Sequence, residues 1–160
     1  LMLSATITGE ILGYFEDAMA AMPILITFIP MLMGTGGNCG SQSSTMVIRG
    51  LAVGEIEFRD FFRVIFKEIR IAVVVGILLA AVNGVRIYIM YDQNIMLAIA
   101  LGITMIAVIC MAKCIGSMLP LLAKKLGLDP AIMAAPLIST VMDPCTMLVY
   151  FAIVTAFFHL

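Results

Sequence analysis

Asp143 combines a charged side chain with a position deep in an apolar run, which makes it the first candidate for chemistry in this chain. It lies about midway along the run from Pro130 to Phe158, where a carboxylate costs roughly 2.5–3.5 kcal/mol on insertion into a bilayer. Such a cost indicates a function. If the run is helical, Asp143 shares one face with Pro136, Ser139, Thr140, Thr146 and Tyr150. We therefore predict one polar stripe on this helix.

Two prolines beside this stripe would release backbone oxygens. Pro144 has no N–H, so the carbonyl of Thr140 loses its helical partner, and Pro136 would free the carbonyl of Ile132 in the same way. A carboxylate with spare carbonyl oxygens is a ligand set for a hard cation. In the alternative, the carboxylate pairs with a basic residue such as Lys113 and the prolines only kink the helix.

A second polar segment lies between Pro30 and Gly50 and reads PMLMGTGGNCGSQSSTMVIRG. As a helix it places on one face Gly34, Asn38, Ser41 or Gln42, and Thr45. Polar groups at membrane depth are tolerated only where they are buried in protein or face a water-filled cavity, so the segment favours a pore or a binding cavity. The glycines remove side chains that would hold a ligand away, although the same pattern is typical of a close helix crossing.

The rest of the chain is apolar enough to live in a lipid bilayer. Of its 160 residues 63% are hydrophobic and 12% are charged, and the mean hydropathy is +1.17, whereas soluble domains average roughly 45–50% and about 25%. The formal net charge of -1 and the lack of a basic stripe argue against nucleic acid as a partner. We expect an all-α integral membrane helix bundle.

Five apolar runs are separated by short connections that hold nearly all the charge. The runs extend over about 1–15, 23–48, 65–88, 95–123 and 130–158. A helix needs about 20 residues to cross the roughly 30 Å hydrocarbon core, and only the first run is too short. We therefore expect one transmembrane pore domain over residues 1–160, with five transmembrane helices and a first helix whose beginning is missing.

Positive residues gather in the second and fourth connections. Around the second lie Arg49, Arg59, Arg63, Lys67 and Arg70, and the fourth holds Lys124 and Lys125. By the positive-inside rule these connections are cytoplasmic, which places the start of the chain inside and its C-terminus outside. The segment 54–70 is also amphipathic, and it either lies along the inner membrane surface or extends the third membrane helix into water.

Four cysteines offer thiols for a soft metal: Cys39, Cys110, Cys114 and Cys145. The chain has no CxxC pair, and its single histidine, His159, lies at the far end. We therefore interpret the thiols as packing residues. The ammonium group of Lys113 would snorkel toward the cytoplasm or extend into a vestibule, and we favour snorkelling.

Two long motifs carry a family resemblance. One is GTGGNCGSQSSTMVIRGLAVGEI over 34–56, the other is PLLAKKLGLDPAIMAAPLIST over 120–140, and Asp143 follows shortly after. With these motifs the chain resembles the MgtE-type magnesium channels and transporters and their solute-carrier relatives in animals. The resemblance implies a two-fold homodimer in a bacterial inner membrane, whose second and fifth helices surround an ion path on the dimer axis.

The resemblance also implies an ion site. Asp143 would be the central carboxylate, helped by the Asn38 amide and by backbone oxygens around Gly34, Ala135 and Ser139. The transported and bound ion would be Mg²⁺, which is small and loses its waters reluctantly, so that few protein ligands suffice. Two departures in the sequence stand out: Pro144 and Cys145 follow the aspartate where many relatives have a small residue or glycine, and position 135, often polar in relatives, is alanine.

The chain looks like an excised membrane domain, because proteins of this type carry cytosolic regulatory domains that are expected in the full-length protein. Its predicted function is a divalent-cation channel or transporter and not an enzyme. An ion-coupled exporter would use the same Asp143 by alternating access. An intramembrane aspartyl protease would need Asp143 and Glu10 to share a proton, which makes it a remote alternative. A purely structural membrane subunit would not need a carboxylate in mid-span.

Overall fold

Every regular element in the described part of the chain is a helix. The computed structural model describes residues 2–91, 94–133 and 135–159. Within these ranges the α-helices are α1 (Met2–Tyr14), α2 (Glu16–Ala21), α3 (Ile29–Ala52), α4 (Phe61–Met90), α5 (Ile95–Lys125) and α6 (Ala135–Phe158). Short 3-10 helices, η1 (Pro23–Phe28), η2 (Phe58–Asp60) and η3 (Pro130–Met133), join some of them. The predicted all-α class is confirmed.

The helices follow the predicted apolar runs closely. The second run divides into η1 and α3, and the third extends to become the 30-residue helix α4. Of the described helices, α5 and α6 are long and apolar enough to cross a membrane by length and composition. Glycines, amides and hydroxyl groups lower the apolar share of α3.

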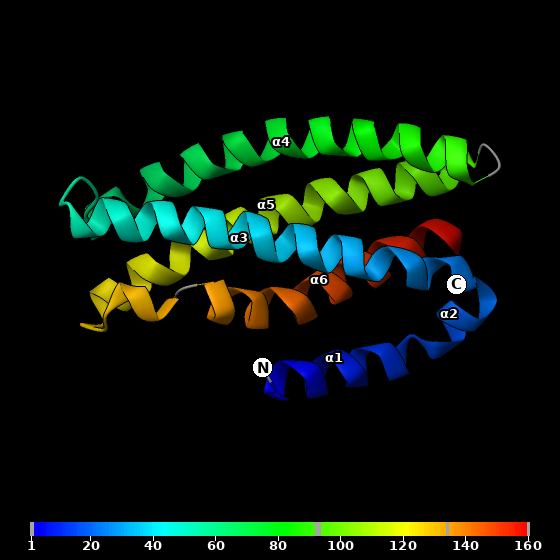
Figure 1. The fold of residues 1–160 in the computed structure, drawn as a ribbon, viewed down its shortest axis with the longest axis horizontal. Helices are drawn as coiled ribbons and strands as arrows, with labels where there is room; N and C mark the ends of the chain where they lie inside the picture. Colours follow the sequence, from blue (N-terminus) through cyan, green and yellow to red (C-terminus); the bar gives the residue numbers. More distant parts are fainter. Residues whose placement is uncertain (1, 92–93, 134, 160) are drawn as a thin grey trace.

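Helix α5 is the centre of the bundle. It packs against α4 on one side and against α3 and α6 on the other, while α1 contacts α6 at the far side (Figure 1). Its buried side chains are mostly apolar, and among them Leu101, Val108, Ile109 and Ala112 are fully inaccessible to solvent. In water, burial of this kind would contribute roughly 25 cal/mol per Å² of apolar surface. Lipid tails are as apolar as these side chains, so in a bilayer the helices are held together mainly by close packing.

Glycines bring α3 against α5. A Cβ atom at Gly116 would collide with the backbone of Gly40, which leaves the two helices in direct backbone contact. Small residues permit such close crossings in membrane bundles, where packing replaces the hydrophobic effect between helices. The close crossing predicted as an alternative for the glycines of α3 is therefore present.

Two connections end at the same end of the bundle, the one after α3 and the one after α5 (Figure 1). Each is turned by a glycine in the left-handed region, Gly54 with φ 75° and Gly127 with φ 73°, a conformation that costs glycine little. The ammonium group of Lys125 lies 4.5 Å from the centre of the Phe58 ring, which joins the two connections. The positive residues of both connections thus gather at one end.

The amphipathic segment 54–70 does not form a separate surface helix. From Phe61 onward it is the first part of α4, which continues without a break to Met90. The prediction of a separate surface helix that turns into the bilayer is therefore wrong, and the segment extends the membrane helix instead.

The fifth apolar run is not one helix. Helix α6 begins at Ala135, so Pro136 stands in its first turn, where a backbone N–H would have no helical partner anyway. The prediction that Pro136 frees the Ile132 carbonyl within a helix is wrong, because Ile132 belongs to η3. Pro144 does lie inside α6, so the carbonyl of Thr140 lacks its helical donor as predicted.

Candidate functional site

The crossing of α3 and α6 determines which residues of the two helices lie opposite each other in the candidate site. A Cβ atom at Gly36 would lie 2.7 Å from Oγ1 of Thr146, and one at Gly40 would lie 2.8 Å from Cγ2 of Ile138. The two helices therefore run antiparallel, with backbones close together. The side chain of Met142 reaches both glycine positions, at 3.5 Å from each.

This register places Asp143 beside the polar segment of α3. Asp143 directly follows Met142 on α6, so its Cα lies level with residues 36–40 of α3, and Asn38 is in the middle of that stretch. The neighbouring Gly37 would bring a Cβ atom within 3.4 Å of the Ser139 hydroxyl. The helices that carry the sequence-predicted residues are thus brought together.

Asp143 and Asn38 keep their polar atoms available. Asp143 is half-buried, and Asn38 and Gly34 are exposed on the surface of one copy. Within the described residues, neither the carboxylate nor the amide has a hydrogen-bond or ion-pair partner. A carboxylate at membrane depth without a partner is costly unless water, an ion or another chain satisfies it.

The hydroxyl groups near the start of α6 bond to their own helix. Ser139 Oγ donates to the Ala135 carbonyl at 3.0 Å, and Thr140 Oγ1 donates to the Pro136 carbonyl at 2.8 Å. Each of the two hydroxyl oxygens keeps its lone pairs free to accept, because it uses only its hydrogen in this bond. Ala135 itself is exposed at the first position of the helix, where its carbonyl oxygen accepts the Ser139 hydroxyl.

The predicted polar stripe of α6 is only half correct. Thr146 is buried against Gly36, and its hydroxyl has no partner within the described residues. Tyr150 is fully buried and donates its hydroxyl to the Leu25 carbonyl at 2.8 Å. These two residues fasten α6 to α3 and η1, and only the part of the stripe up to Asp143 is accessible.

The polar face of α3 borders a surface hollow of about 610 Å³. Its lining residues are Asn38, Ser41, Gln42, Thr45 and Met46. The Thr45 hydroxyl donates to the Ser41 carbonyl at 2.8 Å, while the amides of Asn38 and Gln42 stay exposed. The face predicted from the sequence is therefore a continuous polar surface on one copy of the chain.

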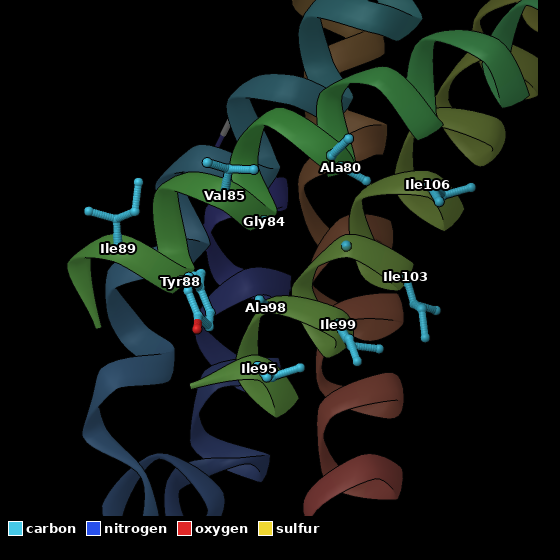
Figure 2. A pocket seen from close by; sticks show the side chains of 12 residues that line it. Ala80, Gly84, Val85, Tyr88, Ile89, Ile95, Ala98, Ile99, Ile103 and Ile106 are labelled. Carbon is cyan, nitrogen blue, oxygen red and sulfur yellow. The ribbon is translucent and has the colours of Figure 1, made fainter. Parts of the chain in front are cut away.

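A larger hollow, of about 700 Å³, lies elsewhere and does not suit an ion. It is formed by α4 and α5, and the side chains around it are almost all aliphatic, as Figure 2 shows for Val85, Ile99 and Ile103. A cation that enters such a surface would lose its water without gaining ligands. The polar face of α3 is the better candidate for an ion path.

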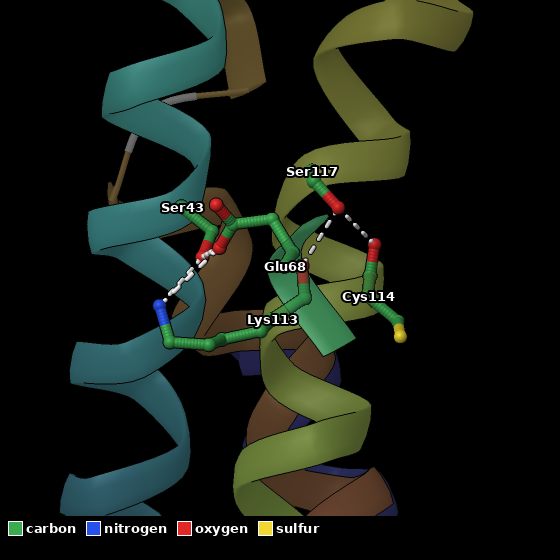
Figure 3. A network of polar contacts seen from close by, with 5 residues as sticks. All are labelled: Ser43, Glu68, Lys113, Cys114 and Ser117. Carbon is green, nitrogen blue, oxygen red and sulfur yellow. Dashed lines mark hydrogen bonds and ion pairs between the residues drawn. The ribbon is translucent and has the colours of Figure 1, made fainter. Parts of the chain in front are cut away.

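Lys113 does not snorkel, and it does not pair with Asp143. Its Nζ lies 3.3 Å from Oε2 of Glu68 and donates to Ser43 Oγ at 3.1 Å, and Ser43 Oγ donates to the same carboxylate at 2.5 Å (Figure 3). The side chains of Lys113 and Glu68 are 8% and 12% exposed. The three sequence-based predictions for Lys113, namely a pair with Asp143, snorkelling and extension into a vestibule, are therefore wrong.

Glu68 is a polar core residue that sequence reasoning missed. It shares the buried face of α4 with Ala72 and Gly76, at intervals of four residues. A carboxylate in line with two small core positions is a signal for inward orientation, but the many charges around it hid the pattern. A buried ion pair is stabilising only with further hydrogen bonds, and Ser43 supplies one.

One copy of the chain offers few charged side chains that could bind a metal ion together. In the part of the chain that the structure describes, no three His, Cys, Asp or Glu side chains gather around a common point. A cation at Asp143 would therefore rely on amide and carbonyl oxygens, on water or on a second copy.

Comparison with known proteins identifies the family. A family model described as a divalent cation transporter, MgtE, matches residues 29–153. The chain belongs to the MgtE family. The match includes the whole polar segment of α3 and nearly all of α6, which are the two helices of the candidate site.

Individual MgtE proteins align over almost the whole chain. The magnesium transporter MgtE of Thermus thermophilus is 35% identical over 153 residues, which cover 96% of this chain and 34% of that protein. The magnesium transporter MgtE of Bacillus subtilis is 35% identical, with 99% and 35% covered. That of Enterococcus faecalis is 34% identical, with 94% and 33% covered. The chain thus spans about a third of the length of these relatives.

Membership of the MgtE family indicates the general class of protein. The family is described by a transport function, that of a divalent cation transporter. Together with the apolar helices α5 and α6, this makes it an integral membrane protein.

Proposed function

We propose that the chain is the transmembrane pore domain of a magnesium transporter, with an ion path between α3 and α6. The observation that carries the proposal is the Asp143 carboxylate, which lacks a partner within the described residues and lies level with Asn38 in an MgtE-family chain. The named relatives are magnesium transporters, which supports Mg²⁺ as the transported ion.

Two copies of the chain would enclose the path. On one copy the exposed face of α3, with Asn38, Gln42 and Thr45, would contact lipid, and hydrocarbon cannot satisfy amides and hydroxyl groups. A two-fold dimer in which α3 and α6 face the axis removes this cost, because each copy then supplies the other with a polar wall. It also doubles the ligands around a central ion.

In the proposed topology each copy crosses the membrane five times, through α1, through η1 with α3, and through α4, α5 and α6. The connections after α3 and α5 lie at one end with the positive residues, which favours the cytoplasmic side of a bacterial inner membrane for that end. Cytosolic regulatory domains are expected in the full-length protein, since the relatives are about three times as long.

The ion would be held largely through its water shell. Mg²⁺ prefers octahedral geometry and gives up water reluctantly. Asp143 would contribute the charge, while the Asn38 amide and the carbonyl oxygens of Gly34, Ala135 and Ser139 would accept or orient the bound waters. Such a site needs only one carboxylate from each copy.

Flux into liposomes tests this function. The variant Asp143→Asn keeps the size of the side chain and removes the charge, so Mg²⁺ uptake by the reconstituted protein should fall to about a tenth or less, as expected when a hydrogen bond to a charged group is weakened. The matched control is Asp17→Asn, the same change at an exposed position of α2, which should leave uptake unchanged.

Wild-type uptake by correctly folded Asp143→Asn protein would contradict the proposal. Cobalt hexaammine, which resembles hydrated Mg²⁺ but keeps its ligands, should inhibit the wild-type protein if the water shell is recognised. Absence of inhibition would show that the ion is coordinated directly.

A further inference from the structure

Helix α4 is longer than a membrane span, and the excess lies at its basic end. Its 30 residues extend for about 45 Å at 1.5 Å per residue, whereas the hydrocarbon core measures roughly 30 Å. The 20 residues from Ile71 to Met90 suffice to cross that core. The first part of α4, from Phe61 to Arg70, then lies in the layer of lipid headgroups.

This first part of α4 carries a row of positive charges. Arg63, Lys67 and Arg70 are spaced by four and three residues, which places them on one side of the helix, and all three are exposed. Within the described residues none of them has an ion-pair partner. Glu68, the acidic residue of the same stretch, is turned inward to Lys113, so it does not neutralise the row.

The row of charges ends at a hollow that is polar at one end and apolar at the other. The hollow has a volume of about 460 Å³ and is lined by Lys67, Arg70, Ile71, Val74 and Val75. Along the helix axis its boundary between charged and aliphatic side chains falls between Arg70 and Ile71, at the expected boundary between headgroups and hydrocarbon.

We propose that this hollow binds one anionic phospholipid, with the headgroup phosphate on Lys67 and Arg70 and an acyl chain along Ile71, Val74 and Val75. Charge complementarity selects the lipid: a zwitterionic headgroup brings its own ammonium group and gains less from two cations, and a free phosphate would leave the aliphatic wall unused. Juxtamembrane basic residues attract anionic lipids at the cytoplasmic surface, and Arg63 adds to the local potential. The inference rests on the proposed topology, in which α4 crosses the membrane, and not on the magnesium site.

Lipid binding to the purified protein tests the proposal. In detergent, native mass spectrometry would measure retention of phosphatidylglycerol and of phosphatidylcholine. The wild-type protein should retain phosphatidylglycerol preferentially, and the double variant Lys67→Gln/Arg70→Gln should bind it about tenfold more weakly or worse, because each basic residue near the surface contributes measurably. The matched control Arg59→Gln/Lys124→Gln removes two charges at the same end of the bundle and should keep the preference.

The variant Val74→Phe tests the apolar half without changing charge. A larger side chain fills the space of the acyl chain, so phosphatidylglycerol retention should fall while the net charge stays constant. This variant decides the question if the double charge variant does not fold. Competition by inorganic phosphate, with no effect of Val74→Phe, would assign the site to a free phosphate and overturn the proposal, and so would equal losses in the charge variant and its control.

Discussion

Lys113 and Glu68 form a buried ion pair, and substitutions at the two residues would measure its contribution to stability. Deleting one partner leaves the other charge buried and alone, and this typically costs roughly 3–5 kcal/mol, whereas replacing both by apolar side chains is often nearly neutral. We therefore expect Glu68→Leu and Lys113→Met each to lower the thermal unfolding temperature in detergent strongly. The double variant should recover most of the loss.

The exposed pair between Arg59 and Glu57 provides the control for this experiment. Its side chains are 79% and 61% exposed, and a pair of this kind is worth about 0–1 kcal/mol. Arg59→Gln should therefore leave the unfolding temperature almost unchanged. If the double variant of the buried pair were no more stable than the single ones, the stabilising role would lie in the Ser43 hydrogen bonds instead.

At the scale of the helices, the backbone contact between α3 and α5 predicts that a larger residue at Gly116 lowers stability. In Gly116→Ala the new methyl group would meet the backbone of Gly40, and overpacking of this kind costs roughly 1–3 kcal/mol. Gly102→Ala is the matched control on the same helix, because its methyl group would lie at an ordinary 3.7 Å from the Ala80 side chain. Thermal unfolding in detergent should separate the two variants, and equal stability would show that α3 can shift without cost.

Hydropathy was sufficient to predict the helices, but it could not predict which faces are buried. Apolar runs report how much of a chain lies in lipid, so the runs at 95–123 and 130–158 correspond well to α5 and α6. The inward position of Glu68 depends on its partner on α5, and the burial of Thr146 depends on a glycine of α3. Neither partner can be identified from the residues adjacent in the sequence. The division of the fifth run into η3 and α6 was also missed, because Pro136 suits both a helix start and a kinked helix.

For the candidate site, the sequence predicted that α3 and α6 carry it, and the structure packs these two helices against each other. The structure adds the level at which Asp143 and the segment 36–40 meet. The assignment of ligands to Asp143, Asn38, Gly34, Ala135 and Ser139 stays a prediction, and the flux experiment addresses it.

At the scale of the whole molecule, the proposed dimer predicts which surface is shared. In a background without the native cysteines, Gln42→Cys on the exposed face of α3 should form a disulfide between two copies under mild oxidation. Val82→Cys, exposed on α4 at 64%, should not. Thr146, a natural choice from the sequence alone, is unsuitable because it is buried against Gly36. Efficient transport by a protein that stays monomeric in the membrane would contradict the proposed dimer.

The attachment of α6 on one side of Pro144 bears on how the proposed site discriminates between ions. Tyr150 and Thr146 contact η1 and α3 in the half of the helix that follows Pro144, so we expect the backbone beside Asp143 to be held in place and the carboxylate to move mainly by rotation of its own short side chain. A carboxylate on a rigid backbone cannot move closer to the ion when the ion loses water and its ligands must come nearer. Calcium, which accepts irregular oxygen ligands, gains little from such rigidity, while an ion that keeps a regular octahedron of water fits a fixed frame. A rigid backbone at the proposed site would then favour ions whose complete hydration shell has the right size.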